Sequence, residues 1–203
     1  MSNGGAGAPG NTAAAADAAQ GGARERLLES AQRLLLGQGR LSDLSLRAMA
    51  ERLGTSHRML IYHFGSRDGL LAALLVEIGR QEQESLLAQD GCGGVLDALR
   101  LLESAYFEGA QSPRTTAFFY VLGLAAQDPE TYRGFLDAID AWVELFTALG
   151  EREGRPHEAA RARAHALVWS ARGAMFQALA AGSSEAALRD FRSVVAQLGY
   201  PIG

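Results

Sequence analysis

The sequence predicts an all-α protein of about nine helices. Along nearly the whole chain after residue 23, apolar residues recur at intervals of three and four positions, the period of one face of an α-helix. Glycine, serine, aspartate and proline interrupt this pattern and supply the residue types that end one helix and cap the next. No segment of any length alternates apolar and polar residues with the two-residue period of a strand.

The N-terminal residues differ in composition from the rest of the chain. Residues 1–23 contain nine Ala and six Gly and almost no side chain that a core could bury, so we expect a disordered tail there. A first helix is predicted from Arg24, because apolar residues follow at helical spacing: Leu27, Leu28, Ala31, Leu34 and Leu35. We expect Gly37 and Gly39 to end this helix.

Three serines mark the starts of the next three helices. Ser45 is placed to cap a second helix that ends at Gly54, and Ser56 is placed to cap a short third helix that ends at Gly65. Ser66 can cap a fourth helix, whose leucines continue at helical spacing.

Further helices are predicted between four breaks in the remaining sequence. The breaks are GCGG, DPE, GRP and GSS, at residues 91–94, 128–130, 154–156 and 182–184. The helix before the first break runs to about Ala88, and later helices begin near Val95, near Pro113 and at each of the other three breaks.

Charge and composition narrow the classes of function. The chain of 203 residues has a formal net charge of −4, yet residues 24–80 hold nine Arg against six Asp and Glu, whereas residues 81–203 hold ten Arg against sixteen. The basic N-terminal part therefore suits an anionic partner. All 19 basic residues are Arg, which excludes a P-loop lysine, a Schiff-base lysine and a Ser–Lys dyad.

The sequence gives little support for a disulfide, a membrane segment or a metal site. Its single cysteine, Cys92, rules out an intrachain disulfide and fits a reduced, cytoplasmic setting. No apolar run approaches the ~20 residues that span a bilayer, and the N-terminus lacks the pattern of a signal peptide. His157 and His165 stand eight residues apart, too far for a joint metal site. We therefore expect no cofactor, no metal and no membrane partner.

Residues 45–64 have the layout of a helix-turn-helix, in which two capped helices flank a tight turn. Ala50 is small enough for the helices to approach closely, and we expect the second helix to bury Leu60, Ile61 and Phe64. In this motif the second helix enters the major groove, where its N-terminal residues meet base edges. Because the N-terminus of a helix also attracts phosphate, the segment predicts a DNA-binding site.

Beyond this motif, the N-terminal part resembles the DNA-binding domain of the TetR (tetracycline-repressor) family of transcriptional regulators. The matching segments, between Arg24 and about Leu75, are RERLLESAQRLLLGQG, LSLRAMAERLGTS and LIYHFGSRDGLL. The chain departs from the family pattern at Thr55, Met59 and Arg67, where the family more often has Val, Thr and Lys. Arg67 keeps the charge for a phosphate contact, whereas Met59 lacks a hydroxyl for one.

The resemblance implies a homodimer whose two recognition helices read a palindromic operator in double-stranded DNA. It implies a helix-turn-helix DNA-binding domain at residues 24–67 and a helical ligand-binding and dimerisation domain at residues 68–203, after the tail at residues 1–23. An unknown small-molecule effector would bind the second domain, shift the fourth helix and release DNA.

Nine residues are the candidates for DNA binding. We expect His57 and Arg58 to contact bases or phosphates, and Ser56 to cap the helix or read a base. Thr55 belongs to the same set, and we expect the remaining residues to contact phosphates: Ser45, Arg47, Tyr62, His63 and Arg67. The alternatives are solvated positions at a helix start, a helix cap for Ser56, partial core packing of the aromatic rings, and an ion pair of Arg67 with Asp68 or Glu51.

The C-terminal part holds more aromatic residues than helical packing needs, and we expect some of them to line an apolar ligand cavity. The candidates, of which the polar members would anchor the ligand, are Tyr106, Phe118, Phe119, Trp142, Phe146, His165, Trp169, Phe176 and Gln177. The alternative for each aromatic residue is an ordinary place in the core.

The last two predicted helices are the candidates for the dimer interface, as one half of a four-helix bundle. Small residues and an apolar stripe on them suit close packing: Ala164, Ala171, Ala174, Leu188, Phe191, Val195 and Leu198. The alternative is that both helices pack within one chain.

The sequence therefore favours a DNA-binding transcriptional repressor that a small apolar or aromatic ligand releases from its operator. The alternative is a TetR-like regulator, repressor or activator, whose C-terminal domain responds to a protein partner or to no ligand. An all-α enzyme is disfavoured, because the sequence lacks a nucleophile–base arrangement, a Gly-rich phosphate loop after a strand and a metal cluster.

Overall fold

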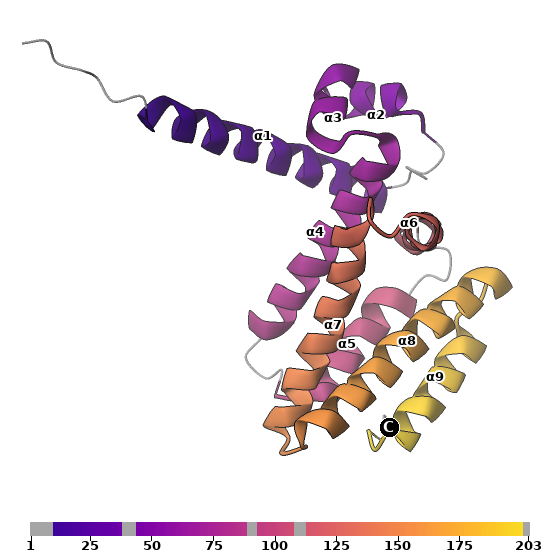
Figure 1. Ribbon diagram of the computed structural model, residues 1–203. Coiled ribbons are helices and arrows are strands. Elements are labelled where there is room, and N and C mark those ends of the chain that lie inside the picture. The colour runs from indigo at the N-terminus through magenta and orange to yellow at the C-terminus, as the bar shows by residue number, and fades with distance from the viewer. Residues whose placement is uncertain (1–9, 38–43, 89–92, 108–112, 201–203) are drawn as a thin grey trace, which may run out of the picture.

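The computed structural model describes residues 10–37, 44–88, 93–107 and 113–200. These ranges contain nine helices and no strand: α1 (Gly10–Gly37), α2 (Leu46–Arg52), α3 (His57–Phe64), α4 (Arg67–Ala88), α5 (Val95–Phe107), α6 (Pro113–Gln127), α7 (Arg133–Arg152), α8 (His157–Ala181) and α9 (Glu185–Gln197). The predicted all-α class is confirmed (Figure 1). Three predicted features lie outside the described residues, namely the tail at residues 1–9, Gly39 and Cys92.

The predicted serine caps are present. Ser45, Ser56 and Ser66 each accept, through Oγ, a hydrogen bond from the backbone N–H three residues later, at 3.2, 3.2 and 2.9 Å. Gly54 and Gly65 follow α2 and α3 with φ angles of 65° and 72°, in the left-handed region that favours glycine. The two short helices therefore begin and end where the local sequence predicts.

Two helices start at positions other than those predicted. α1 begins at Gly10 and so includes residues 10–23, for which the sequence predicts disorder. The alanines of this segment have high helix propensity even though the segment lacks an amphipathic face. α7 begins at Arg133 rather than at residues 128–130, because Asp128 first forms a turn, accepting a hydrogen bond at 3.2 Å from the backbone N–H three residues on.

Two hydrophobic cores share the long helices α4 and α7. The N-terminal core packs α1 to α4 against α6 and the start of α7, and the C-terminal core packs the end of α4 against α5 and α7 to α9. α4 contributes Leu70 and Leu71 to the first core and Leu86 to the second, so one continuous helix joins both (Figure 1).

Candidate DNA-binding surface and ligand cavity

α2 and α3 form a helix-turn-helix around a small buried centre. Met49, Ala50 and Leu60 are at most 3% exposed, as expected for the crossing point of the two helices. The turn between them is closed by a hydrogen bond of 2.9 Å from the Thr55 N–H to the Ala50 carbonyl. The motif predicted at residues 45–64 is therefore present.

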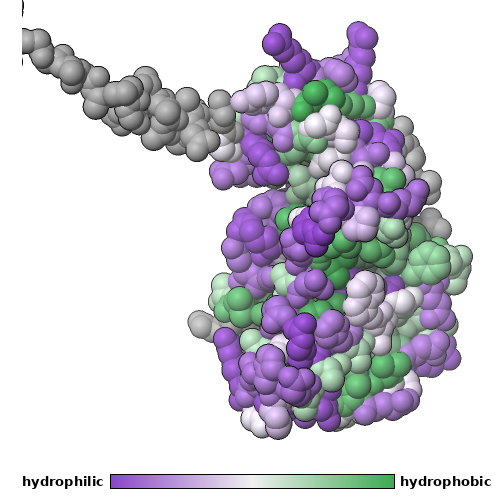
Figure 2. All heavy atoms as spheres, in the orientation of Figure 1, coloured by the Kyte–Doolittle hydropathy of each residue, from purple (hydrophilic) through white to green (hydrophobic). Residues whose placement is uncertain are grey.

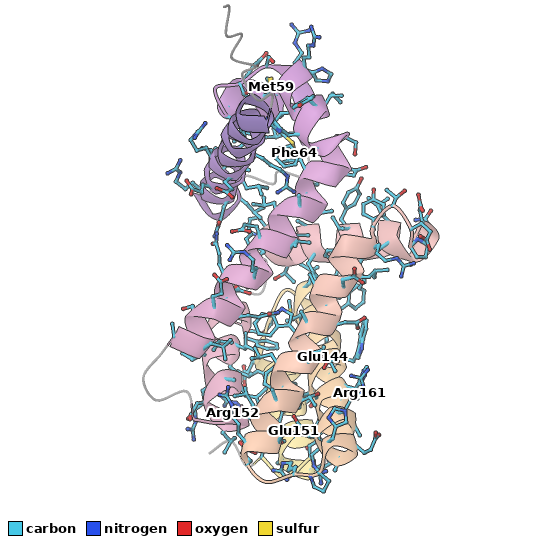
Figure 3. The ribbon with its side chains drawn as sticks, turned by 60° about the vertical axis from the view of Figure 1, so that its left-hand side comes forward. Met59, Phe64, Glu144, Glu151, Arg152 and Arg161 are labelled. Atoms are coloured by element: carbon cyan, nitrogen blue, oxygen red, sulfur yellow. The ribbon has the colours of Figure 1, made fainter. Side chains whose placement is uncertain are left out.

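The side of α3 away from this centre is open to solvent. His57 and Arg58 in its first turn are exposed, and Tyr62 is 62% exposed. Arg47 on α2 is exposed too, with only a long ion pair of 3.8 Å within its own helix. Figure 2 shows hydrophilic side chains projecting from this end of the molecule, and Figure 3 places Met59 there. Several predicted DNA contacts thus share one exposed end.

Two residues of α3 lie differently from the prediction. Ile61, expected in the core, is 42% exposed, because it lies about 100° around the helix from Leu60. His63 is half-buried between Tyr62 and Phe64, with ring centroids 5.0 and 6.1 Å away. Its Nε2 atom is buried and has no hydrogen-bond partner among the described residues. These contacts favour the packing alternative for His63.

Arg67, at the start of α4, is held against α6. Its Nη2 atom lies 2.8 Å from Asp68 Oδ1 and donates a hydrogen bond of 2.5 Å to the hydroxyl of Tyr120, and its guanidinium carbon lies 5.2 Å from the centre of that ring. The Tyr120 hydroxyl donates in turn to Asp68 Oδ1 at 3.1 Å. Burial lowers the pKa of the Arg67 guanidinium, but the hydrogen bonds and charges of Asp68 and Tyr120 together outweigh burial and raise that pKa. The ion-pair alternative is thus the arrangement present.

The C-terminal part contains an apolar cavity of about 90 Å³, with walls from α4 to α9. Six aromatic side chains line it: Phe107, Phe118, Phe135, Trp142, Phe146 and Phe191. Three of the predicted pocket residues, Phe118, Trp142 and Phe146, are among them. The side chain of Tyr106, another candidate, lies outside the described residues.

The remaining pocket candidates do not line this cavity. Phe119 packs its ring 5.2 Å from that of Phe176, and Trp169 and Phe176 are 47% and 56% exposed. His165 is half-buried outside the cavity wall, and Gln177 is exposed. This corrects the prediction. For the four residues of α8 the reason is the rotational position of that helix, which turns other residues inward: Leu167, Val168, Ala171, Arg172 and Met175.

Charged side chains also belong to the cavity wall. Glu103 is 8% exposed and accepts three hydrogen bonds from Arg192, at 2.8, 3.1 and 3.2 Å. Glu82 pairs with Arg114, and the Arg172 guanidinium lies over the ring of Phe118, 5.5 Å from its centre. Sequence reasoning missed both ion pairs, because their partners stand 89 and 32 positions apart and no local spacing connects them.

The residues predicted for the dimer interface are buried in the chain's own C-terminal core. Four are at most 6% exposed, namely Ala164, Ala174, Phe191 and Val195. The other three, Ala171, Leu188 and Leu198, pack against the same core. This corrects the prediction: α8 and α9 use these residues to pack on each other within one chain, as the alternative had it.

Within the ranges that the structure describes, no three His, Cys, Asp or Glu side chains are grouped to hold a metal ion. No single helix there is long and apolar enough to cross a membrane, and α3 and α4 meet those criteria only together, as a pair bent by 61°.

A helix-turn-helix with an exposed second helix, followed by a helical domain with a cavity, defines a DNA-binding regulator of the helix-turn-helix class. Residues 27–74 match the family model described as "Bacterial regulatory proteins, tetR family". The predicted resemblance is confirmed over these residues, which are similar to the DNA-binding part of tetR-family regulators.

Solved structures share this fold over most of their length. A TetR-family transcriptional regulator from Pectobacterium atrosepticum is 20% identical, over 92% of this chain and 97% of the other, with a TM-score of 0.64. GusR of Salmonella enterica is 16% identical, over 88% and 94%, with a TM-score of 0.62. The multidrug binding protein EbrR, solved in complex with malachite green, is 19% identical, over 88% and 98%, with a TM-score of 0.56. The search of curated proteins gave no match.

Proposed function

We propose that the protein is a homodimeric transcriptional repressor that binds a palindromic operator and leaves it when a small ligand enters the cavity. The observation that carries the proposal is the exposed first turn of α3, which Ser56 caps and where His57 and Arg58 face solvent. The N-terminus of a helix attracts phosphate, and an arginine can bind guanine through two hydrogen bonds. The domain boundary predicted at residue 67 belongs to this proposal, as does action in the cytoplasm.

The exposed residues divide into two kinds of contact. We assign base edges to His57 and Arg58, which occupy the N-terminal turn of the recognition helix. The phosphate contacts are assigned to the exposed or half-buried residues around them, namely Ser45, Arg47, Thr55, Ser56 and Tyr62. His63 and Arg67 join them only after leaving their present contacts.

For the homodimer, we assign the exposed face of α8 in place of the residues predicted from sequence. Apolar and small residues recur on this face at intervals of three and four: Ala162, Ala166, Trp169, Gly173, Phe176 and Ala180. Trp169 and Phe176 are 47% and 56% exposed in the single chain, which favours their burial against a partner. The spacing suits close packing of α8 on α8 of a second copy.

The cavity and the DNA-binding end are connected through α6. Thr115 and Phe118 of this helix line the cavity, and Tyr120, on the same helix, holds Arg67. A ligand that moves the α6 wall therefore changes a contact at the base of the DNA-binding domain. Such a ligand shifts the equilibrium between the DNA-binding state and the released state only by the difference between its binding free energies for these two states.

A small ligand is favoured over a protein partner as the signal. Six aromatic rings line the cavity, and they suit an apolar compound. The fold is shared with EbrR, whose structure holds malachite green. A regulator whose signal is a protein partner does not require such a cavity.

The test is selection of bound duplexes from fragmented DNA of the source organism, followed by footprinting of the protein on the selected sequence. We expect a protected palindrome, and about tenfold or greater weakening by Arg58→Ala, since a bidentate contact contributes about 1–3 kcal/mol. Arg152→Ala is the matched control, because this exposed arginine lies at the opposite end of the molecule (Figure 3). Failure to select any duplex, or undiminished binding by Arg58→Ala, would contradict the proposal.

A further inference from the structure

The indole N–H of Trp142 is a hydrogen-bond donor in the cavity wall. Trp142 is 7% exposed and lines the cavity, and its N–H makes no hydrogen bond to another residue in the part of the chain that the structure describes. Its nitrogen lies beside Gly79, another cavity residue, since a Cβ added there would be 3.6 Å from Nε1. An indole nitrogen can only donate a hydrogen bond. A ligand that brings an acceptor into the cavity can therefore bind this N–H.

Thr115 adds a second polar group from α6. It is 4% exposed, lines the same cavity and makes no hydrogen bond through its hydroxyl to any described residue. Thr147 provides the contrast, because this threonine is 2% exposed but donates to the Val143 carbonyl at 2.7 Å. The Thr115 hydroxyl is therefore placed to bind a guest, and the Thr147 hydroxyl is not.

The two carboxylates of the wall are already engaged by arginines. Glu103 accepts three hydrogen bonds from Arg192, and Glu82 pairs with Arg114. Arg172 adds a further guanidinium to the cavity wall beside that of Arg114. A cationic ligand would have to displace an arginine from its carboxylate or bind next to positive charge, and both are unfavourable.

We propose that the effector is an aromatic compound that carries an acceptor oxygen, as in an aryl ketone, a quinone or an aromatic carboxylate, and that this oxygen binds the N–H of Trp142. The aromatic residues of the wall pack against the ring, and Thr115 and the guanidiniums of the wall offer further hydrogen-bond donors. This assignment rests on the proposed function, in which the cavity binds the effector, and it excludes lipophilic amines.

The experiment uses three probes with one carbon skeleton: acetophenone, ethylbenzene and α-methylbenzylamine. Their affinities for the full-length protein are measured by calorimetry and thermal shift. We expect the ketone to bind most tightly and the ammonium most weakly. Trp142→Phe keeps an aromatic ring but removes the N–H. It should therefore weaken the affinity for acetophenone about fivefold and leave the affinity for ethylbenzene unchanged. Tyr200→Phe, which removes a polar group from a buried aromatic side chain outside the cavity, is the control.

Three results would overturn the inference. The ammonium could bind more tightly than the ketone, Trp142→Phe could weaken ketone and hydrocarbon equally, or none of the probes could bind. In the first two results the proposed function survives, because the cavity still takes a ligand. If no probe binds, the ligand-binding part of the proposed function also fails. Footprinting with the same preparations then tests the DNA-binding part. If Trp142→Phe does not fold, Thr115→Val with the same probes supplies the test, with the same selective loss of ketone expected.

Discussion

The substitution Tyr120→Phe would remove one hydroxyl from the contact between α4 and α6 and keep the ring beside Arg67. That hydroxyl accepts a hydrogen bond from Arg67 and donates one to Asp68, so both bonds are lost together. Because these bonds hold the arginine against α6, we expect Tyr120→Phe to make Arg67 more available to a DNA phosphate. Affinity for duplex DNA should rise.

The size of the effect follows from the exposure of the partners. A hydrogen bond to a charged group contributes about 1.5–3 kcal/mol when it is well buried. The side chains of Arg67 and Asp68 are each 29% exposed and keep their mutual contact of 2.8 Å, so we expect a smaller loss of about 1 kcal/mol. One added phosphate contact steepens the dependence of log K on log salt by about 0.9 per chain.

The assay is fluorescence anisotropy of a labelled mixed-sequence duplex over a series of salt concentrations. Arg67→Gln should flatten the salt dependence strongly when combined with Tyr120→Phe and only slightly on its own. Equal effects of Arg67→Gln in the two backgrounds would refute the reasoning, because Tyr120 would then not restrain the arginine. Tyr200→Phe is the control, since its hydroxyl accepts a bond of 2.9 Å from Arg155 in the C-terminal part.

Three further outcomes are expected. Ser56→Ala removes the cap of α3 and should lower the free energy of unfolding by about 1 kcal/mol in urea titrations, without changing the m-value. The hydrogen bond from Arg80 lowers the pKa of Glu77 below 4.5, so its stabilising contribution is present above that value and lost as the pH falls through the folded-state pKa. Glu77→Gln should therefore flatten the acid side of the stability–pH curve, and an unchanged acid side would contradict the assignment. Phe176→Asp should convert a dimer to a monomer in sedimentation velocity, whereas a dimer that persists would remove the α8 face from the interface.

Features that depend on neighbouring residues could be read from the sequence. Ser45, Ser56 and Ser66 cap their helices through bonds that reach only three residues, and Gly54 and Gly65 turn the chain through their own φ angles. The exposure of the first turn of α3 could be predicted as well, although Ile61, expected in the core, is exposed.

Features that depend on distant segments could not be predicted. α8 carries two apolar stripes, one through Leu167 and Met175 and the other through Trp169 and Phe176, and spacing alone does not tell which one faces the chain's own core. The same holds for Arg67, since a charge beside the recognition helix fits a phosphate contact until Tyr120, 53 residues away, is known to lie against it.

α4 unites the two sites, because one continuous helix supports the DNA-binding end and forms part of the cavity wall. Its first half holds Leu70 and Leu71 in the N-terminal core, and Leu75, Ile78 and Gly79 line the cavity. Its 22 residues span about 33 Å, so a tilt of about 5° about the middle moves each end by about 1.5 Å. A base-reading hydrogen bond at about 2.9 Å is lost over much less than that distance. A ligand that tilts α4 would therefore separate α3 from its bases without unfolding it, and the cap of Ser56 would stay intact in the released state.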